Sequence, residues 1–121
     1  MKIDSKFYYS IIFSSLLLVA GCSVEHGVRK EDVLKEGLYQ MRVAIDQYTQ
    51  DKQMAPQHLT DLVSAGYLHA IPKDPFTNSA KTWVEVQEDT LHSIDQTQPG
   101  ISDVHSGSNL VSSDGTRYDS W

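Results

Sequence analysis

The stretch that decides the fold covers residues 34–48 and reads LKEGLYQMRVAIDQY. Its large apolar residues recur at alternating steps of four and three, at positions 34, 38, 41, 45 and 48. This spacing places them on one side of an α-helix, so the stretch predicts an amphipathic helix with one buried stripe. Charged residues that suit the two ends of a helix extend the prediction to residues 29–52.

Two apolar residues of this predicted helix lie away from the stripe. At about 100° per residue, Tyr39 and Val43 fall roughly 140° and 180° from it, next to Asp32 and Asp46. We therefore expect both side chains to be exposed. Aromatic anchors contribute much of the energy of protein contacts, which makes Tyr39 and Val43 candidate partner-binding residues. The alternative is that they are ordinary exposed apolar residues without a function.

A second, shorter helix is predicted over residues 57–65. Pro56 suits the first turn of a helix, and Leu59 and Leu62 are spaced to face inward. Gly66 fits the position after the end of the helix, where glycine readily adopts a positive φ.

Two prolines define the next segment. Pro72 and Pro75 exclude both a helix and a central strand and predict a rigid, extended connection. Asp74, between them, is expected to be a turn residue rather than an acid catalyst.

The rest of the chain indicates short strands. Residues 82–86 alternate and are rich in β-formers, which predicts a strand with Trp83 on one face and Val84 on the other. Residues 87–102 are polar and predict a long loop, and residues 103–121 predict one or two short strands with tight turns. We expect the buried stripe of the first helix to pack against Leu59, Leu62 and the Trp83 strand.

The first 21 residues have the pattern of an export signal. Lys2 and Lys6 precede an apolar run at residues 7–20, which is too short and too rich in serine and tyrosine to span a bilayer. The run ends in Leu-Val-Ala-Gly-Cys at residues 18–22, which resembles the bacterial lipobox. That resemblance implies that Cys22 is lipidated and becomes the new N-terminus. The alternative for a lone cysteine is a small buried apolar residue.

These features divide the chain into three parts: a lipoprotein signal peptide (1–21), a lipidated polar tether (22–28) and a globular domain (29–121). Two or three acyl chains on Cys22 would anchor the protein stably to a membrane. Ser23, rather than aspartate, after the cysteine favours the outer membrane by analogy with enterobacterial sorting. The expected location is therefore the bacterial cell envelope, facing the periplasm.

Composition excludes several classes of function. The 121 residues include 16 acidic and 10 basic side chains, for a net charge of −6. Nucleic-acid binding requires clustered Lys and Arg, so DNA and RNA are not expected partners. One cysteine allows no intrachain disulfide.

The residues that could carry catalysis form no recognisable pattern. The five histidines, at positions 26, 58, 69, 92 and 105, show no pair at metal-ligand spacing, and each is expected to be a surface residue. No nucleophile elbow or glycine-rich phosphate loop occurs in the sequence. We therefore expect a protein that is not an enzyme and has no catalytic residues.

Several blocks, in order and at matching spacing, resemble the major pseudopilin (G-type subunit) of bacterial type II secretion systems. They are LYQMRVAIDQY (38–48), AP (55–56), LTDLVSAGYL (59–68), IPKDP (71–75), DVHSGS (103–108) and SDGTRY (113–118), followed by the final Trp121. The resemblance covers about residues 35–121. It implies an α+β fold, in which a long N-terminal helix packs on a small antiparallel sheet with a short second helix. It also implies a non-enzymatic role in an envelope filament that exports folded proteins.

The N-terminus departs from this family. Pseudopilins are cleaved after a glycine that is followed by Phe or Met and about 20 apolar residues, which form the core of the filament. Here Gly21 is followed by Cys22 and polar residues, without an apolar run. A lipid anchor thus takes the place of the polymerising half of the helix.

A calcium site is the one cofactor that the resemblance suggests, besides the covalent lipid. Related pseudopilins hold calcium in the C-terminal loop, where this chain has Asp103, Asp114 and Asp119 in a segment rich in Gly and Ser. Such carboxylates suit an ion that takes six to eight oxygen ligands. The alternative is that these residues only form turns.

Two functions therefore remain open. The first is a lipid-anchored pseudopilin-like protein that works with protein partners in type II secretion or a related pilus-like machine. The second is a free-standing envelope lipoprotein that uses the same domain to bind a partner or a small ligand.

Overall fold

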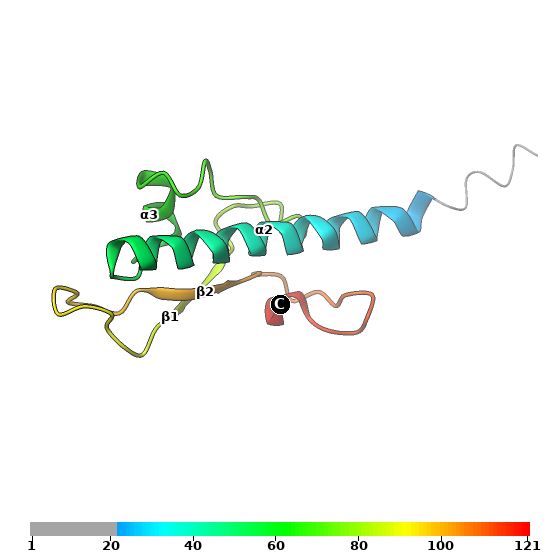
Figure 1. Ribbon diagram of the computed structural model, residues 1–121. Helices are drawn as coiled ribbons and strands as arrows, with labels where there is room; N and C mark the ends of the chain where they lie inside the picture. The colour runs from blue at the N-terminus through cyan, green and yellow to red at the C-terminus, as the bar shows by residue number, and fades with distance from the viewer. Residues whose placement is uncertain (1–21) are drawn as a thin grey trace, which may run out of the picture.

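The computed structural model describes residues 22–121, with side chains from residue 29 onward. It has an α+β fold, in which one long helix crosses the domain and lies over a small sheet (Figure 1). The elements are α2 (Cys22–Lys52), α3 (Leu59–Ser64), β1 (Val84–Gln87), β2 (Ile101–His105) and the 3-10 helix η1 (Tyr118–Ser120). The predicted signal peptide lies outside the described residues.

The long helix α2 begins earlier than the sequence pattern indicates. It starts at Cys22 rather than Arg29, so the residues predicted as a tether are helical. Gly27 is the least favourable residue of this segment for a helix, at a cost of about 1 kcal/mol relative to Ala. The helix ends at Lys52 as predicted, where Gln53 adopts a φ of 55°. In the described part of the chain, no helix is long and apolar enough to cross a membrane.

The predicted stripe on α2 forms the centre of the core. Leu34, Leu38, Met41 and Ile45 are buried, and Tyr48 packs partly buried against them. As predicted, the stripe meets Leu59, Leu62 and Trp83, and the core cluster also includes Ala44, Ile101, Val104 and Tyr118. The indole N–H of Trp83 donates to the carbonyl of Pro72 (2.8 Å), so the buried ring leaves no donor unpaired.

Helix α3 begins two residues later than predicted because His58, with an extended backbone, is its N-cap residue. The Asp61 carboxylate accepts the N–H groups of Gln57 and His58 (3.0 Å each), and His58 has extended backbone angles. The carboxylate of Glu85 in β1 accepts the N–H of Leu59 (2.9 Å), which ties the start of α3 to the sheet.

The end of α3 agrees with the prediction for Gly66. This residue has a φ of +83°, and its N–H donates to the Val63 carbonyl at 3.1 Å. The N–H of Tyr67 reaches back to the Leu62 carbonyl at 2.8 Å, which completes a Schellman motif.

Asp74 is a buried turn residue, as predicted. Its carboxylate accepts the N–H of Phe76 (2.8 Å) and the hydroxyl of Ser106. Its backbone pairs with Ser79 in an isolated bridge. The carboxylate therefore joins the proline segment to the residues after β2.

The two strands form an antiparallel sheet in which Glu85 pairs with Val104. The predicted strand over residues 82–86 is shifted along the chain, because β1 covers Val84–Gln87 and the buried Trp83 lies just before it. Val84 is 50% exposed. The predicted loop is wrong at its end, because β2 already begins at Ile101. Beyond β2, the predicted strands reduce to one bridge between Val111 and Arg117, followed by η1.

Candidate partner-binding surface on α2

The outward side of α2 carries the two residues that the sequence singles out for partner binding. Tyr39 is 65% exposed, as predicted. Val43 is half-buried, which corrects the prediction that both side chains are exposed. The reason is tertiary, because Val43 lines an open groove together with Tyr67, Leu68 and other residues of the segment after α3.

Tyr39 forms a ridge between two grooves on opposite flanks of α2. The groove shared with Val43 has a volume of about 290 Å³. The other groove has a volume of about 350 Å³ and a mainly apolar lining. That second groove is lined by Lys35, Leu38, Tyr39, Arg42 and Trp121. A partner that contacts Tyr39 can therefore enter either side of the ridge.

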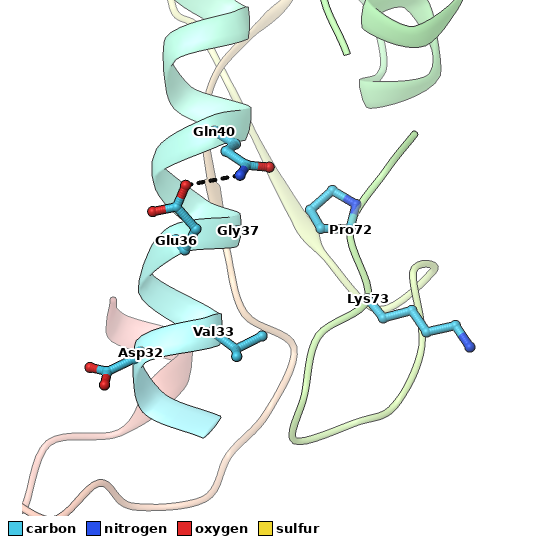
Figure 2. Close-up of a pocket in the computed structure, with 7 residues that line it drawn as sticks. All are labelled: Asp32, Val33, Glu36, Gly37, Gln40, Pro72 and Lys73. Atoms are coloured by element: carbon cyan, nitrogen blue, oxygen red, sulfur yellow. Dashed lines mark hydrogen bonds between the residues drawn. The ribbon is translucent and has the colours of Figure 1, made fainter. Parts of the chain in front are cut away.

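A third groove, which the sequence did not indicate, lies between α2 and the proline segment (Figure 2). It has a volume of about 480 Å³ and is lined by Asp32, Val33, Glu36, Gly37, Gln40, Pro72 and Lys73. Figure 2 shows the Pro72 ring facing Gly37, where a Cβ atom would stand 3.6 Å from the ring. Gln40 donates to Glu36 (2.9 Å) and also lines the groove of Tyr39 and Val43, so the two grooves adjoin along the helix.

On the opposite flank of α2, two cationic side chains, Lys35 and Arg42, border the groove beside Trp121. The ammonium of Lys35 lies 4.9 Å from the ring centroid of Trp121. Arg42 donates to the Asp103 carboxylate (2.7 Å) and to the Val104 carbonyl (3.0 Å), which joins α2 to β2. Burial raises the pKa of Asp103, but the Val104 N–H and the Arg42 guanidinium outweigh it and hold the pKa below its usual value.

The three aspartates considered for calcium have separate partners. Asp103 pairs with Arg42, and Asp119 forms an ion pair with Arg117 (2.5 Å). Asp114 accepts the hydroxyls of Ser112 and Thr116, which lower its pKa to about 2. Within residues 29–121, no group of three His, Cys, Asp or Glu side chains could hold a metal ion. This arrangement favours the turn-forming role of Asp114.

Calcium binding by the C-terminal loop has a direct test. An ion that binds only the folded protein raises Tm with its free concentration. Because the three carboxylates are separately paired, we expect millimolar calcium to leave Tm unchanged in a thermal melt. A rise that is absent in Asp114→Ala, with apo stability retained, would instead show that the loop binds the ion.

Glu31 has a role in the fold that the sequence pattern did not indicate, since that pattern suggested only a favourable charge near the start of the helix and a pair with Lys35. It is only 8% exposed, and it accepts the N–H (2.9 Å) and hydroxyl (3.0 Å) of Ser113 and the hydroxyl of Tyr118 (2.8 Å). These bonds fasten the C-terminal loop to α2. The available signal was its spacing, since Glu31 precedes Leu34 by three residues and therefore extends the buried stripe.

The pKa values of this cluster follow from its contacts. The Ser113 N–H is the main cause that lowers the pKa of Glu31, and the Tyr118 hydroxyl adds to it. Burial, followed by the bond to Glu31, raises the pKa of Tyr118 to about 12. Glu31 is thus held as a carboxylate and Tyr118 as a neutral phenol.

Glu31→Gln should lower the free energy of unfolding at neutral pH. It should also make the free energy of unfolding fall less as the pH is lowered. A carboxyl whose folded pKa is depressed adds stability above its ordinary pKa, here 4.5, and that stability is lost as pH falls through the folded value. Denaturant titrations between neutral pH and pH about 3 would measure both effects. Glu36→Gln, which alters an exposed carboxylate on the same helix, is the control. Equal pH profiles for the two variants would contradict the role of Glu31.

The remaining predicted site residue, Cys22, is the first residue of α2, and its side chain lies outside the described part. Comparison with protein-family models, curated proteins and solved structures finds no match. The function is therefore argued from the sequence motifs and from the surface of α2.

Proposed function

We propose that this protein is a non-enzymatic, lipid-anchored, pseudopilin-like protein of the bacterial cell envelope. In this proposal it acts in type II protein secretion or a related pilus-like machine. Cys22 carries the lipid, the domain faces the periplasm, and the outer membrane is favoured over the inner. Its partners are proteins of the same machine, and nucleic acid is not among them.

The observation that carries the proposal is that the two sides of α2 differ. One side of the helix forms the core with Leu38, Met41 and Ile45, while the opposite side presents Tyr39 between two grooves. A helix that spans the domain and leaves an aromatic ridge exposed suits lateral association with other subunits. The α+β fold, with a short second helix and a small sheet, agrees with the pseudopilin-like head that the sequence blocks imply.

A second candidate is a free-standing envelope lipoprotein that binds a partner or a small ligand. The missing apolar run after Gly21 favours it, because a subunit without that run lacks the usual means of polymerising. The groove between α2 and Pro72 offers this candidate a second binding surface.

Photo-crosslinking distinguishes the two candidates. A photoreactive phenylalanine analogue at position 39 should crosslink in cells to components of a secretion or pilus-like machine, identified by mass spectrometry. The same analogue at Val84, which is 50% exposed on β1, is the control. Crosslinks only to proteins outside any such machine would favour the free-standing lipoprotein.

Tyr39→Ala combined with Val43→Ser should reduce these crosslinks and any associated secretion by several-fold. Folding should change little, because Tyr39 is exposed and Val43 is only half-buried. Leu91→Ser, at a residue that is 50% exposed in the loop between β1 and β2, is the matched control. If the double variant folds, crosslinks and secretes like the wild type, the partner does not bind this face of α2.

A further inference from the structure

The groove between α2 and the proline segment carries opposite charges on its two edges. Asp32 and Glu36, one turn apart on α2, form an acidic rim, and Lys73 forms a basic rim on the facing segment. Figure 2 shows the two carboxylates pointing away from the proline segment and the Lys73 side chain pointing away from the helix. All three side chains are exposed, so each rim can meet a partner that covers the groove.

The rim charges are not neutralised within the domain. Among the ion pairs of residues 29–121, none includes Asp32, Glu36 or Lys73. Two like charges one turn apart on a helix destabilise it slightly, and a cation from a partner relieves this repulsion. Arg29, one turn before Val33, is exposed but does not line the groove.

Between the two rims the groove has an open apolar floor. Gly37 contributes no side chain there, and the ring of Pro72 forms the opposite wall. Val33 is 55% exposed, and Figure 2 shows its side chain pointing from α2 toward the side of the proline segment. The groove therefore offers both an apolar recess and an apolar side chain that projects beside it.

This arrangement is complementary to a second copy of itself. A two-fold axis through the groove brings the acidic rim of each copy opposite the basic rim of the other. Both rim contacts then join opposite charges. The same rotation brings Val33 of each copy toward Pro72 of the other, so the apolar floors cover one another.

The two signs of charge also select the occupant. A groove with rims of one sign fits any peptide of the opposite charge. A groove with one acidic and one basic rim requires an occupant that carries both charges at the same separation and in reverse order. A second copy of this chain meets that requirement because its rims are the same residues.

We propose that the groove between α2 and Pro72 is the contact surface of a symmetric dimer of this protein. Contacts that bury little surface are weak, so the dimer forms at high protein concentration and dilute protein is monomeric. The inference goes beyond the proposed function and does not depend on the lipid anchor. It leaves the groove beside Trp121, on the other flank of α2, open to a different partner.

Charge reversal tests the dimer in residues 23–121, which contain the whole core cluster. The first variant combines Asp32→Lys with Glu36→Lys, so that both rims are basic. The second variant is Lys73→Glu, so that both rims are acidic. Asp46→Lys, which reverses an exposed charge on α2 outside the groove, is the matched control. Sedimentation equilibrium up to millimolar protein measures the dissociation constant of each sample, and circular dichroism checks that each is folded.

We expect each rim variant alone to dimerise about ten-fold or more weakly than the wild type, because attraction becomes repulsion at both rims. An equimolar mixture of the two variants should form a mixed dimer with nearly wild-type affinity. The control should dimerise like the wild type, and high salt should weaken the wild-type dimer several-fold.

Three results would overturn the proposal. One is a wild-type protein that stays monomeric at millimolar concentration. Another is a dimer that both rim variants retain, because it would then use another surface. The last is a mixture of folded rim variants that does not dimerise more tightly than either variant alone.

Discussion

Cys22→Ser should abolish lipid attachment and leave the signal peptide uncleaved. The lipid is transferred to the sulfur of the cysteine, and a serine hydroxyl is a far weaker nucleophile than a thiolate. Metabolic labelling with palmitate should therefore give a labelled wild-type band and no labelled band for the variant. Electrophoresis should show the variant at the higher mass of the precursor that retains residues 1–21.

Ser23→Ala is the matched control, because it changes the adjacent residue and leaves the thiol in place. It should be labelled and processed like the wild type. Label in Cys22→Ser, or none in the wild type, would show that the protein is not a lipoprotein.

Leu38→Ala and Ile45→Ala should each destabilise the domain by about 2 to 5 kcal/mol. Both side chains are 2% exposed and belong to the cluster in which α2 meets α3 and the sheet. Total stability is typically about 5 to 15 kcal/mol, so either variant loses a large part of it. The measurement is the thermal or urea-induced unfolding of residues 23–121 without the lipid, and Tm should fall by roughly 10 °C or more.

Val33→Ala provides the control for these core variants. Val33 lies on the same helix but is 55% exposed, so its truncation should change Tm by only a few degrees. A Tm change of less than about two degrees for both Leu38→Ala and Ile45→Ala would mean that α2 is not packed on the domain through this stripe.

The local elements were predictable because their signals lie within a few residues. Apolar residues at alternating steps of three and four residues identified the helix and its buried side. The helix ends at Lys52, as predicted. Gly66 identified the end of α3 because a positive φ is costly for other residues. Asp74 was identified as a turn residue from the two flanking prolines.

The strands were predicted less well, because a strand depends on its partner. Ile101 and Ser102 were assigned to a loop from their polar surroundings, yet both belong to β2, in which Ile101 lies opposite Gln87 of β1. Backbone pairing between segments 14 residues apart leaves little trace in either segment alone. Of the one or two short strands predicted in residues 103–121, the structure has the end of β2 at residues 103–105, followed by only one bridge and η1.

The candidate site was predicted in part. Tyr39 is exposed, as its position opposite the stripe indicates. Val43 has a similar position on the helix, but the segment after α3 forms a groove beside it. The groove beside Pro72 was missed for the same reason, since it forms only where two distant segments meet.

The sequence by itself determined the long helix and its buried side, the stops at Gly66 and the prolines, and the pattern of a lipoprotein signal. All of these follow from the geometry of neighbouring residues or from a contiguous motif. Only the tertiary structure decided that Glu31 is buried and that it fastens a loop 82 residues further along the chain. A carboxylate next to exposed residues on a helix is normally solvated, and it becomes buried only when the folded chain brings the hydrogen-bond donors of Ser113 and Tyr118 to it.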